Sequence, residues 1–382
     1  MKRKALIISG NLFPAISGDS IYSQGLIDRL FNLVKIDVCA YGSNEQLSKS
    51  IFNERQQFFS LINRSVLDKS KIQRLFNFGS IKQVYTDEMF LLVKNKIENN
   101  DYDYIIIDHL RVYSIVRGLY NLIKSKKIKI IYVAHNIEYV NLEESIKFEK
   151  NIFNKILMYF SNFGLKKLEQ EILQRTHITW ALTHEDKNKL KTISNKCVFY
   201  VVPTFFRWKK VKNNESLNLT SKTLLILGSM NWYPNVIGTT HFVKEVFNKI
   251  IEIDADFKLY IVGQKPTQTV KNLSSNSVIV TGRVESVDEY IKKSDVLIIP
   301  NKLGSGIKIK FYEAVFKGIP VICYEENIVG YYSKLLKKPF VVNNENDFVS
   351  SIFKVYSDFE LKKNFLDSFV FENKLDSNIF IS

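Results

Sequence analysis

One stretch of the sequence, from Ser294 to Cys323, constrains the fold more than any other. It begins with a continuous apolar run, Val296–Ile299, which predicts a strand buried on both faces. A glycine loop follows, and apolar residues spaced by three and four then predict a helix that ends at Gly318. A second short apolar run closes the stretch. Strand, glycine loop, helix and strand in this order predict one unit of a parallel α/β sheet.

The same stretch carries residue types that suit a nucleotide. Glycines let the backbone approach a ligand closely, and the free N–H groups at a helix start favour a phosphate. Lys310, Glu313 and Lys317 share one polar edge of the predicted helix. A carboxylate accepts both hydroxyl protons of a ribose, and a lysine favours a phosphate. The stretch alone leaves open an ordinary crossover helix with a solvated edge.

The remainder of the chain repeats this alternation of strand and helix. Buried apolar runs predict further strands at 4–9, 36–41, 104–108, 128–134, 178–183, 198–202, 223–227, 258–262 and 278–281. Long helical patterns cover 141–175 and 346–371. Unbroken apolar strands that alternate with helices are typical of parallel sheets with both faces covered.

The domain organisation follows from a polar segment at 209–221, which has no apolar period and predicts a linker. We expect an α/β protein with two doubly wound, Rossmann-like domains that face each other across a cleft. The first covers 1–208 and the second 222–345. The C-terminal helices, 346–382, are expected to pack back towards the first domain.

Composition limits the partners. The chain of 382 residues has 54 Lys and Arg against 39 Asp and Glu, a net charge of +15, which favours an anionic partner. No nucleic-acid-binding motif is recognisable, so nucleic acid is a minor alternative. A basic stretch at 64–82 with apolar anchors is typical of a helix on an anionic membrane surface, and equally of a solvated helix on the core.

The cellular location follows from what the sequence lacks. No apolar run approaches the roughly 20 residues of a membrane-spanning helix, and the start lacks the pattern of a signal peptide. Three well-separated cysteines indicate a reducing compartment. We expect a cytoplasmic protein, peripheral on the inner face of the cell membrane.

Several motifs, taken together and in order, resemble GT-B glycosyltransferases of family 4. The donor-site signature of that family is similar to Gly304-Ser305-Gly306 with Lys308, Lys310 and Glu313, and the Gly-Ser-Gly sequence is typical of one branch. Supporting similarities cover 228–235, 260–263 and 281–284 in the second half, and 13–18, 135–138 and 201–203 in the first.

The resemblance implies a nucleotide-diphosphate sugar held mainly by the second domain and an acceptor held mainly by the first. Glu313 matches the glutamate that binds the donor ribose. The implied donor-binding residues are Gly18, Gly228, Asn231, Arg283, Val284, Gly304, Ser305, Gly306, Lys308, Lys310 and Glu313. His135 matches a histidine near the transferred sugar and is the catalytic candidate. Glu138 and His109, the latter at a strand end, are acceptor-binding candidates.

The sequence departs from the family pattern at three positions. Ser305 stands where the family usually has a glutamate, and Ser229 and Pro234 stand where many members have an arginine and a lysine. We interpret this as a variant donor site in which Lys308 and Lys310 supply the positive charge. The departures keep open a non-catalytic nucleotide-sugar-binding subunit, and a GT-B nucleotide-sugar epimerase is a further alternative.

The resemblance also implies a reaction class. It predicts a retaining hexosyltransferase without a protein nucleophile, in which the leaving phosphate takes the proton of the acceptor, with no metal and no cofactor beyond the sugar nucleotide. The expected acceptor is lipid-linked or a saccharide, in the biosynthesis of a bacterial surface polysaccharide such as an O-antigen or a capsule.

Overall fold

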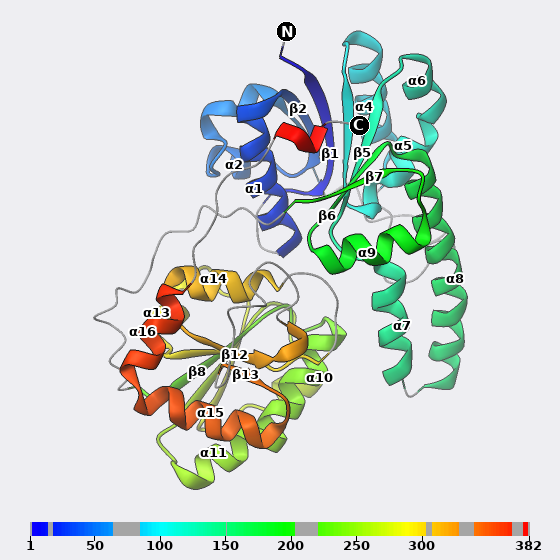
Figure 1. The fold of residues 1–382 in the computed structure, drawn as a ribbon. Coiled ribbons are helices and arrows are strands. Elements are labelled where there is room, and N and C mark those ends of the chain that lie inside the picture. The colour runs from blue at the N-terminus through cyan, green and yellow to red at the C-terminus, as the bar shows by residue number, and fades with distance from the viewer. Residues whose placement is uncertain are drawn as a thin grey trace. The chain divides into compact units, whose positions relative to one another are not determined.

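The computed structural model describes residues 2–13, 18–63, 85–149, 151–202, 221–302, 308–327, 340–368 and 377–380. The chain divides into two compact units, residues 1–206 with 373–382, and residues 207–372. Each unit contains one parallel sheet with helices packed on it (Figure 1).

The first unit is built on a sheet of seven strands within the described residues, in the order β3-β2-β1-β4-β5-β6-β7. The strands are β1 (Lys4–Asn11), β2 (Lys35–Tyr41), β3 (Phe59–Ile62), β4 (Tyr104–Asp108), β5 (Lys129–Ala134), β6 (Ile178–Ala181) and β7 (Val198–Val201). The chain fills the sheet outward from β1 in one direction and from β4 in the other. The order therefore reverses between β1 and β4, which are paired in parallel with Ser9 opposite Asp108.

The helices of the first unit connect these parallel strands. They are α1 (Gly18–Leu33), α2 (Asn44–Ser48), α4 (Asp87–Asn99), α5 (Tyr113–Gly118), α6 (Tyr120–Ser125), α7 (Glu138–Phe148), α8 (Ile152–Arg175) and α9 (His184–Ile193). Short 3₁₀ turns lie at Asn53–Phe58 and Leu110–Val112. Parallel strands need such crossovers, because the chain must return to the same end of the sheet.

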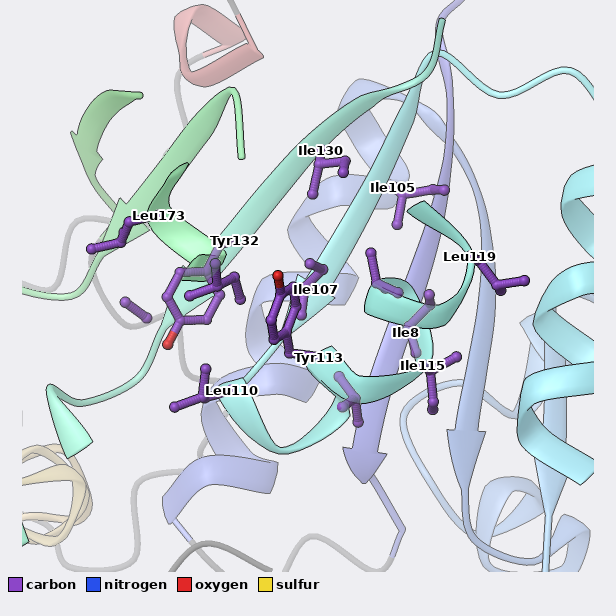
Figure 2. Close-up of a cluster of buried hydrophobic side chains, with 14 of the residues drawn as sticks. Ile8, Ile105, Ile107, Leu110, Tyr113, Ile115, Leu119, Ile130, Tyr132 and Leu173 are labelled. Carbon is purple, nitrogen blue, oxygen red and sulfur yellow. The ribbon is translucent and has the colours of Figure 1, made fainter. Parts of the chain in front are cut away.

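The core on one face of this sheet is made of branched apolar side chains from neighbouring strands. Ile8, Ile105 and Ile107 come from β1 and β4, and all three are completely buried. Tyr113 and Ile115 lie over them from α5, as Figure 2 shows. Strands buried on both faces select unbroken apolar sequences, which explains why these strands were predictable.

The second unit has a sheet of six strands in its described residues, in the order β10-β9-β8-β11-β12-β13. The strands are β8 (Thr223–Leu227), β9 (Lys258–Val262), β10 (Val278–Gly282), β11 (Val296–Ile299), β12 (Val321–Tyr324) and β13 (Val341–Val342). The strand order reverses between the paired strands β8 and β11. In an open α/β sheet, ligands bind at such a switch point, outside the carboxyl ends of the strands.

The helices of the second unit follow its strands. They are α10 (Tyr233–Phe242), α11 (Asn248–Ile253), α12 (Gln268–Lys271), α13 (Asp288–Lys293), α14 (Ile309–Lys317), α15 (Glu345–Ser357) and α16 (Phe359–Asp367). A π-helical turn, Val243–Phe247, joins α10 to α11. Gly318 ends α14 in the left-handed conformation, with φ at 91°, as expected of a glycine after a helix.

The α/β fold class is confirmed, and the predicted strands lie within one or two residues of those observed. The helical pattern predicted for 141–175 corresponds to two helices, because α7 ends at Phe148 and α8 starts at Ile152. Asn151 caps the new helix, its Oδ1 accepting from the N–H of Asn154 at 3.1 Å. The described part of the pattern at 346–371 likewise contains two helices, α15 and α16, and Asp358 caps the second by accepting from the N–H of Leu361.

The C-terminal part of the chain contributes to both units. Helices α15 and α16 belong to the second unit, whereas residues 377–380 belong to the first. There the hydroxyl of Tyr104 donates to the carbonyl of Phe380 at 3.0 Å, and the indole of Trp180 donates to the carbonyl of Ile379 at 3.1 Å.

The basic stretch at 64–82 and most of the predicted linker, 209–220, lie outside the described residues. Across the segments that the structure does describe, no helix combines the length and apolar character needed to cross a membrane.

Candidate functional site

The first cluster of functional side chains lies at the switch point of the seven-stranded sheet. Ser9 and Asp108 are at the carboxyl ends of β1 and β4, and His135 directly follows β5. The Nε2 of His135 lies 2.7 Å from Oδ1 of Asp108, and the hydroxyl of Ser9 donates to Oδ2 at 2.5 Å. All three side chains are buried. The carboxylate is therefore bonded through both oxygens, and it orients the His135 ring.

Burial disfavours the charged forms of Asp108 and His135, but the attraction between the two residues outweighs burial and shifts both pKa values towards the charged pair. Burial alone would raise the pKa of Asp108, but the charge and hydrogen bond of His135 outweigh burial and lower it. Burial would lower the pKa of His135, but Asp108 raises it. Because the ionised carboxylate only accepts, Nε2 of His135 carries the proton of this bond.

His109 lies beside His135 but has a different environment. The two ring centroids are 5.0 Å apart. Burial, and then the charges of Arg111 and His135, hold the pKa of His109 well below its usual value. Its Nδ1 accepts from the backbone N–H of Arg111 at 3.2 Å, so its proton lies on Nε2. Two neighbouring histidines thus have pKa values displaced in opposite directions, as is common where proton positions matter.

The backbone of His109 is unusual. Its φ is +87° and its ψ is 143°, a conformation that residues other than glycine rarely adopt. Its Nε2 is buried and has no hydrogen-bond partner in the described part of the chain. Such strain costs about 1–3 kcal/mol and is concentrated at functional sites. The fold holds His109 against this cost.

Two glutamates complete the cluster. Oε1 of Glu138 lies 3.4 Å from Nε2 of His109, and burial raises the pKa of Glu138 to about 7. Glu169 accepts from the backbone N–H groups of Glu138 and Tyr139 at 2.8 and 3.0 Å. Glu169, which lies on α8, thereby caps the start of α7. A residue next to the helix in sequence usually has this role. Burial raises the pKa of Glu169 to about 8.

Gly18 begins α1, beside this cluster. The next residue, Asp19, has Oδ2 3.9 Å from Nε2 of His109 and 3.7 Å from the guanidinium of Arg111. The start of α1 therefore faces the ends of β4 and β5. The structure brings together Gly18, His109, His135 and Glu138, four of the residues that the sequence indicated.

The second cluster lies at the switch point of the six-stranded sheet. Oδ1 of Asn235 accepts from the amide of Asn301 at 2.9 Å and from Nζ of Lys310 at 3.3 Å. Lys310 also donates to Oδ1 of Asn301 at 3.4 Å, and Asn327 donates to the backbone carbonyl of Asn301 at 2.6 Å. Two amide side chains thus hold the lysine beyond the carboxyl ends of β8 and β11, and a third, that of Asn327, fixes the backbone of Asn301.

The charge of Lys310 is not neutralised by these neighbours. Within the described residues, Lys310 donates to two amide oxygens, and neither is a carboxylate oxygen. Removal from water, reinforced by the charge of Lys308, lowers the pKa of Lys310 to about 7. Lys308 is buried at the start of α14, with Nζ 6.0 Å from the ring centre of Trp232. Two partly desolvated cations at a strand-to-helix connection are suited to an anion.

Glu313 is held by an ion pair on α14. Its Oε1 accepts from Nζ of Lys317 at 2.5 Å, and Lys317 also donates to Asp288 at 2.6 Å. Burial would lower the pKa of Lys317, but the two carboxylates raise it. The Glu313 side chain is only 12% exposed. The pair fixes the carboxylate in place, one helical turn beyond Lys310.

The glycine loop after β8 lies against the end of β9. A Cβ added to Gly263 would lie 1.6 Å from the carbonyl oxygen of Gly228, and one added to Gly228 would lie 2.5 Å from the amide of Asn235. This close approach excludes any side chain at either position. Asn231 is exposed and accepts from the hydroxyl of Ser229 at 2.7 Å, so in this structure it is not part of the buried network.

The remaining predicted donor residues lie apart from the amide network or cannot be placed. Arg283 is exposed and Val284 half-buried after β10. Gly304, Ser305 and Gly306 lie outside the described residues. No group of three or more His, Cys, Asp and Glu side chains is arranged to hold a metal ion in the described part of the chain.

Sequence reasoning missed several members of both clusters. Asp108 was noticed only as part of a loop, and Ser9 only as the end of a strand. Asn235 was noticed within a motif, whereas Asn301 and Asn327 were not indicated at all. Asp108 ends β4, Ser9 lies near the end of β1 and Asn301 lies two residues after β11, so the signal available for these three was a polar residue near the carboxyl end of a buried strand. Asn235 lies inside α10 and gives no such signal.

The fold places the chain in a known class. A structure of Anabaena HepE in complex with UDP and glucose superposes with a TM-score of 0.64 at 11% identity, over 95% of this chain and 92% of that chain. A mutant of S. aureus TarM in complex with Fondaparinux, alpha-GlcNAc-glycerol and UDP gives 0.65 at 11%, over 96% and 95%. A glycosyltransferase from Rickettsia africae gives 0.58 at 15%, over 96% and 92%. The chain has the GT-B fold of two Rossmann-like units.

The family match is more specific but covers just over a third of the chain. Residues 221–358 match the family described as Glycosyl transferases group 1. No curated protein matches the chain by sequence. The matched residues make up most of the second unit, and the site at β8 and β11 lies within them.

Proposed function

We propose that this protein transfers a sugar from a nucleotide-diphosphate donor to a lipid-linked or saccharide acceptor with retention of configuration. The observation that carries the proposal is Lys310, a partly buried cation with amide partners at the switch point of the second sheet. An unneutralised charge there is costly for the free protein and favours a bound anion. A diphosphate supplies that anion.

The donor is assigned to the second unit. Lys310 and Lys308 bind the diphosphate, and Glu313 accepts hydrogen bonds from the ribose hydroxyls with the help of the Lys317 pair. The glycine residues 304 and 306 are expected to present backbone N–H groups to the same phosphates. Similar structures contain UDP or UDP-glucose, which supports a nucleotide sugar as the donor.

The reaction then needs no protein nucleophile. The bond between the anomeric carbon and the diphosphate oxygen breaks, and its electron pair stays on the leaving diphosphate. The acceptor hydroxyl forms the new bond on the same face and gives its proton to the leaving phosphate oxygen. Lys310 stabilises the charge that develops there, and one such donor typically lowers a barrier by about 3 kcal/mol. We propose that no metal is required.

The acceptor and the transferred sugar are assigned to the first unit. His135, oriented by Asp108, binds the sugar, while the Nε2 proton of His109 and the carboxyl group of Glu138 are donors for acceptor hydroxyls. At a pKa of about 7, Glu138 is partly protonated near neutral pH and both donates and accepts.

The biological role is proposed from the family resemblance and the charge. We infer that the product belongs to a bacterial surface polysaccharide, and that the protein works in the cytoplasm at the inner face of the membrane. A net charge of +15 suits a surface that is anionic. The complex of the TarM mutant contains alpha-GlcNAc-glycerol, a saccharide-bearing molecule, together with UDP, which is consistent with this class of acceptor.

To test this proposal, the purified protein is incubated with a panel of nucleotide sugars. Donor binding is measured by saturation-transfer NMR, and slow hydrolysis of the donor is measured in parallel. Glu313→Ala and Lys310→Ala are compared with wild type, and Lys249→Ala on α11 serves as a matched lysine control. We expect one donor to bind, its binding to be lost in both site variants and to persist in the control. Binding without hydrolysis or transfer would favour a non-catalytic subunit, and free epimerised sugar nucleotide would favour an epimerase. Unchanged binding by the site variants would refute the site.

A further inference from the structure

The first half of α8 exposes an apolar face. Seven large apolar side chains are exposed there: Ile152, Phe153, Ile156, Leu157, Tyr159, Phe160 and Phe163. Phe160 is 73% exposed and Ile152 71%, far above the level of the buried side chains on the same helix. At about 100° per residue, the seven fall within an arc of about 160°. We name these seven residues the α8 apolar face.

The opposite side of α8 is the one that packs on the unit. Leu165, Glu169, Ile172 and Leu173 are buried and centre on the direction opposite to the apolar face. Helices α7 and α8 lie side by side as a hairpin (Figure 1), joined by a bond from Asn162 to Glu143 at 3.4 Å. The α8 apolar face is therefore an outer surface, where a helix in water normally carries polar residues.

Charge accompanies this surface. Residues 150–168 include four lysines and no aspartate or glutamate. Lys155 lies among the apolar residues, and Lys166 and Lys167 follow them, with Nζ 5.3 Å from the ring of Tyr139 and 4.3 Å from that of Phe163. Glu169, the next acidic residue, is buried and occupied in capping α7. Two further acids lie near the helix and are hydrogen-bonded: Glu149 accepts from the N–H of Asn151, and Glu143 of α7 accepts from the amide of Asn162. Apolar and aromatic side chains on a stretch with lysines and no acidic residue are typical of a helix that lies in the headgroup region of an anionic membrane.

We propose that the α8 apolar face inserts into the headgroup region of an anionic phospholipid bilayer and anchors the first unit there. This rests on the proposed function in one respect, since it places the unit assigned to the acceptor at the surface where a lipid-linked acceptor lies. The occupant is a bilayer and not a second copy of the chain, because two such faces would bring their lysines together, with no acidic residue in 150–168 to offset them.

The site differs from the one that the sequence suggested. The basic stretch at 64–82 lies outside the described residues, whereas the α8 apolar face is observed. The α8 apolar face could not be predicted from the sequence of 141–175, because a continuous helical pattern does not show which side of the helix packs against the rest of the unit. The burial of Leu165, Glu169, Ile172 and Leu173 identifies the inner side.

The experiment is co-sedimentation of the full chain with vesicles of phosphatidylcholine, with or without about one-third phosphatidylglycerol. We expect binding to the anionic vesicles and at least tenfold weaker binding by F153S/F160S. The matched control is L91S/I253S, which removes two exposed apolar side chains elsewhere and should bind like wild type. K155Q/K167Q should reduce the preference for anionic lipid.

Three results would overturn the proposal: no binding by wild type, equal binding by F153S/F160S, or a dimer that F153S/F160S abolishes without any vesicle binding. Nucleotide-sugar binding, measured in parallel by NMR, separates this proposal from the proposed function. If the wild-type protein binds the donor but not the vesicles, only the membrane proposal fails. If it binds the vesicles but no donor, only the proposed function fails.

Discussion

His135 and Asp108 form a buried pair at the switch point of the first sheet, with Nε2 and Oδ1 2.7 Å apart. Because β4 and β5 are adjacent parallel strands, their carboxyl ends bring the two residues together although 27 positions separate them in sequence. The pair is thus a product of topology. In the proposed reaction Asp108 is a positioning residue, because it acts through His135.

Asp108→Asn should test this relationship with little change of shape. Loss of the negative charge lowers the pKa of His135, and the ring loses its fixed orientation. We expect kcat to fall about 100-fold, the scale of a displaced active-site group, with a smaller change in KM for the donor. NMR titration of His135 would report the pKa directly. Ser9→Ala, which removes only the bond to the other carboxylate oxygen, should lower the His135 pKa much less. An unchanged His135 titration in Asp108→Asn would refute the coupling.

At position 109, the glycine variant should be more stable than the alanine variant, which reverses the usual order. Both substitutions remove the imidazole, but only glycine relieves the backbone at φ +87°. His109→Gly should therefore be more stable than His109→Ala by about 1–2 kcal/mol, measured by denaturant unfolding. At Ser60, in strand β3, the ordinary order is expected, with alanine the more stable. Equal stability of the two His109 variants would mean that the conformation is not strained.

Donor affinity should depend on pH through Lys310. With a pKa of about 7 in the free protein, the side chain loses its proton as the pH rises above 7, while a bound diphosphate raises its pKa again. Donor binding should therefore take up a proton and weaken as the pH rises from about 7 to 8, with a limit of tenfold per pH unit. Calorimetry in buffers of different ionisation enthalpy measures this uptake.

The control for this pH dependence is an arginine, which stays charged. Lys310→Arg should bind donor with a flat pH profile over the same range. Lys302→Arg, at an exposed lysine that bonds to Glu345, should retain the wild-type slope. A wild-type profile that is flat, or one that Lys310→Arg leaves unchanged, would remove Lys310 from the diphosphate site.

Features set by a single segment of the chain could be predicted from the sequence, whereas features set by the arrangement of neighbouring strands could not. The strands Val296–Ile299 and Tyr104–Asp108 were predictable, because burial on both faces requires unbroken apolar runs. Lys310 and Glu313 were indicated by a motif within one helix. Asn301 and Asp108 were not, because a single polar residue after a strand gains its meaning only from the neighbouring strand. The break at Asn151 was missed, since capping residues also occur within helical patterns.

Gly263 should be one of the least replaceable positions of the second unit. A Cβ at this position would lie 1.6 Å from the carbonyl oxygen of Gly228, and no rotamer relieves a clash with backbone. Gly263→Ala must therefore separate the ends of β8 and β9, whose pairing continues through the bond from Gly228 N–H to the carbonyl of Val262 at 3.1 Å. We expect a loss of about 3 kcal/mol or more in the free energy of unfolding.

The consequence should reach the donor site, because Gly228 leads directly into the turn whose Ser229 carbonyl accepts from Asn235 at 3.0 Å. Moving that carbonyl shifts Asn235 and with it Lys310, so any folded Gly263→Ala protein should bind donor at least tenfold more weakly. Gly10→Ala is the control, since a Cβ there meets nothing within 4 Å, and it should leave stability and donor binding unchanged. Calorimetric unfolding and donor titration of both variants would decide, and wild-type behaviour of Gly263→Ala would show that the two strand ends are not packed as closely as described.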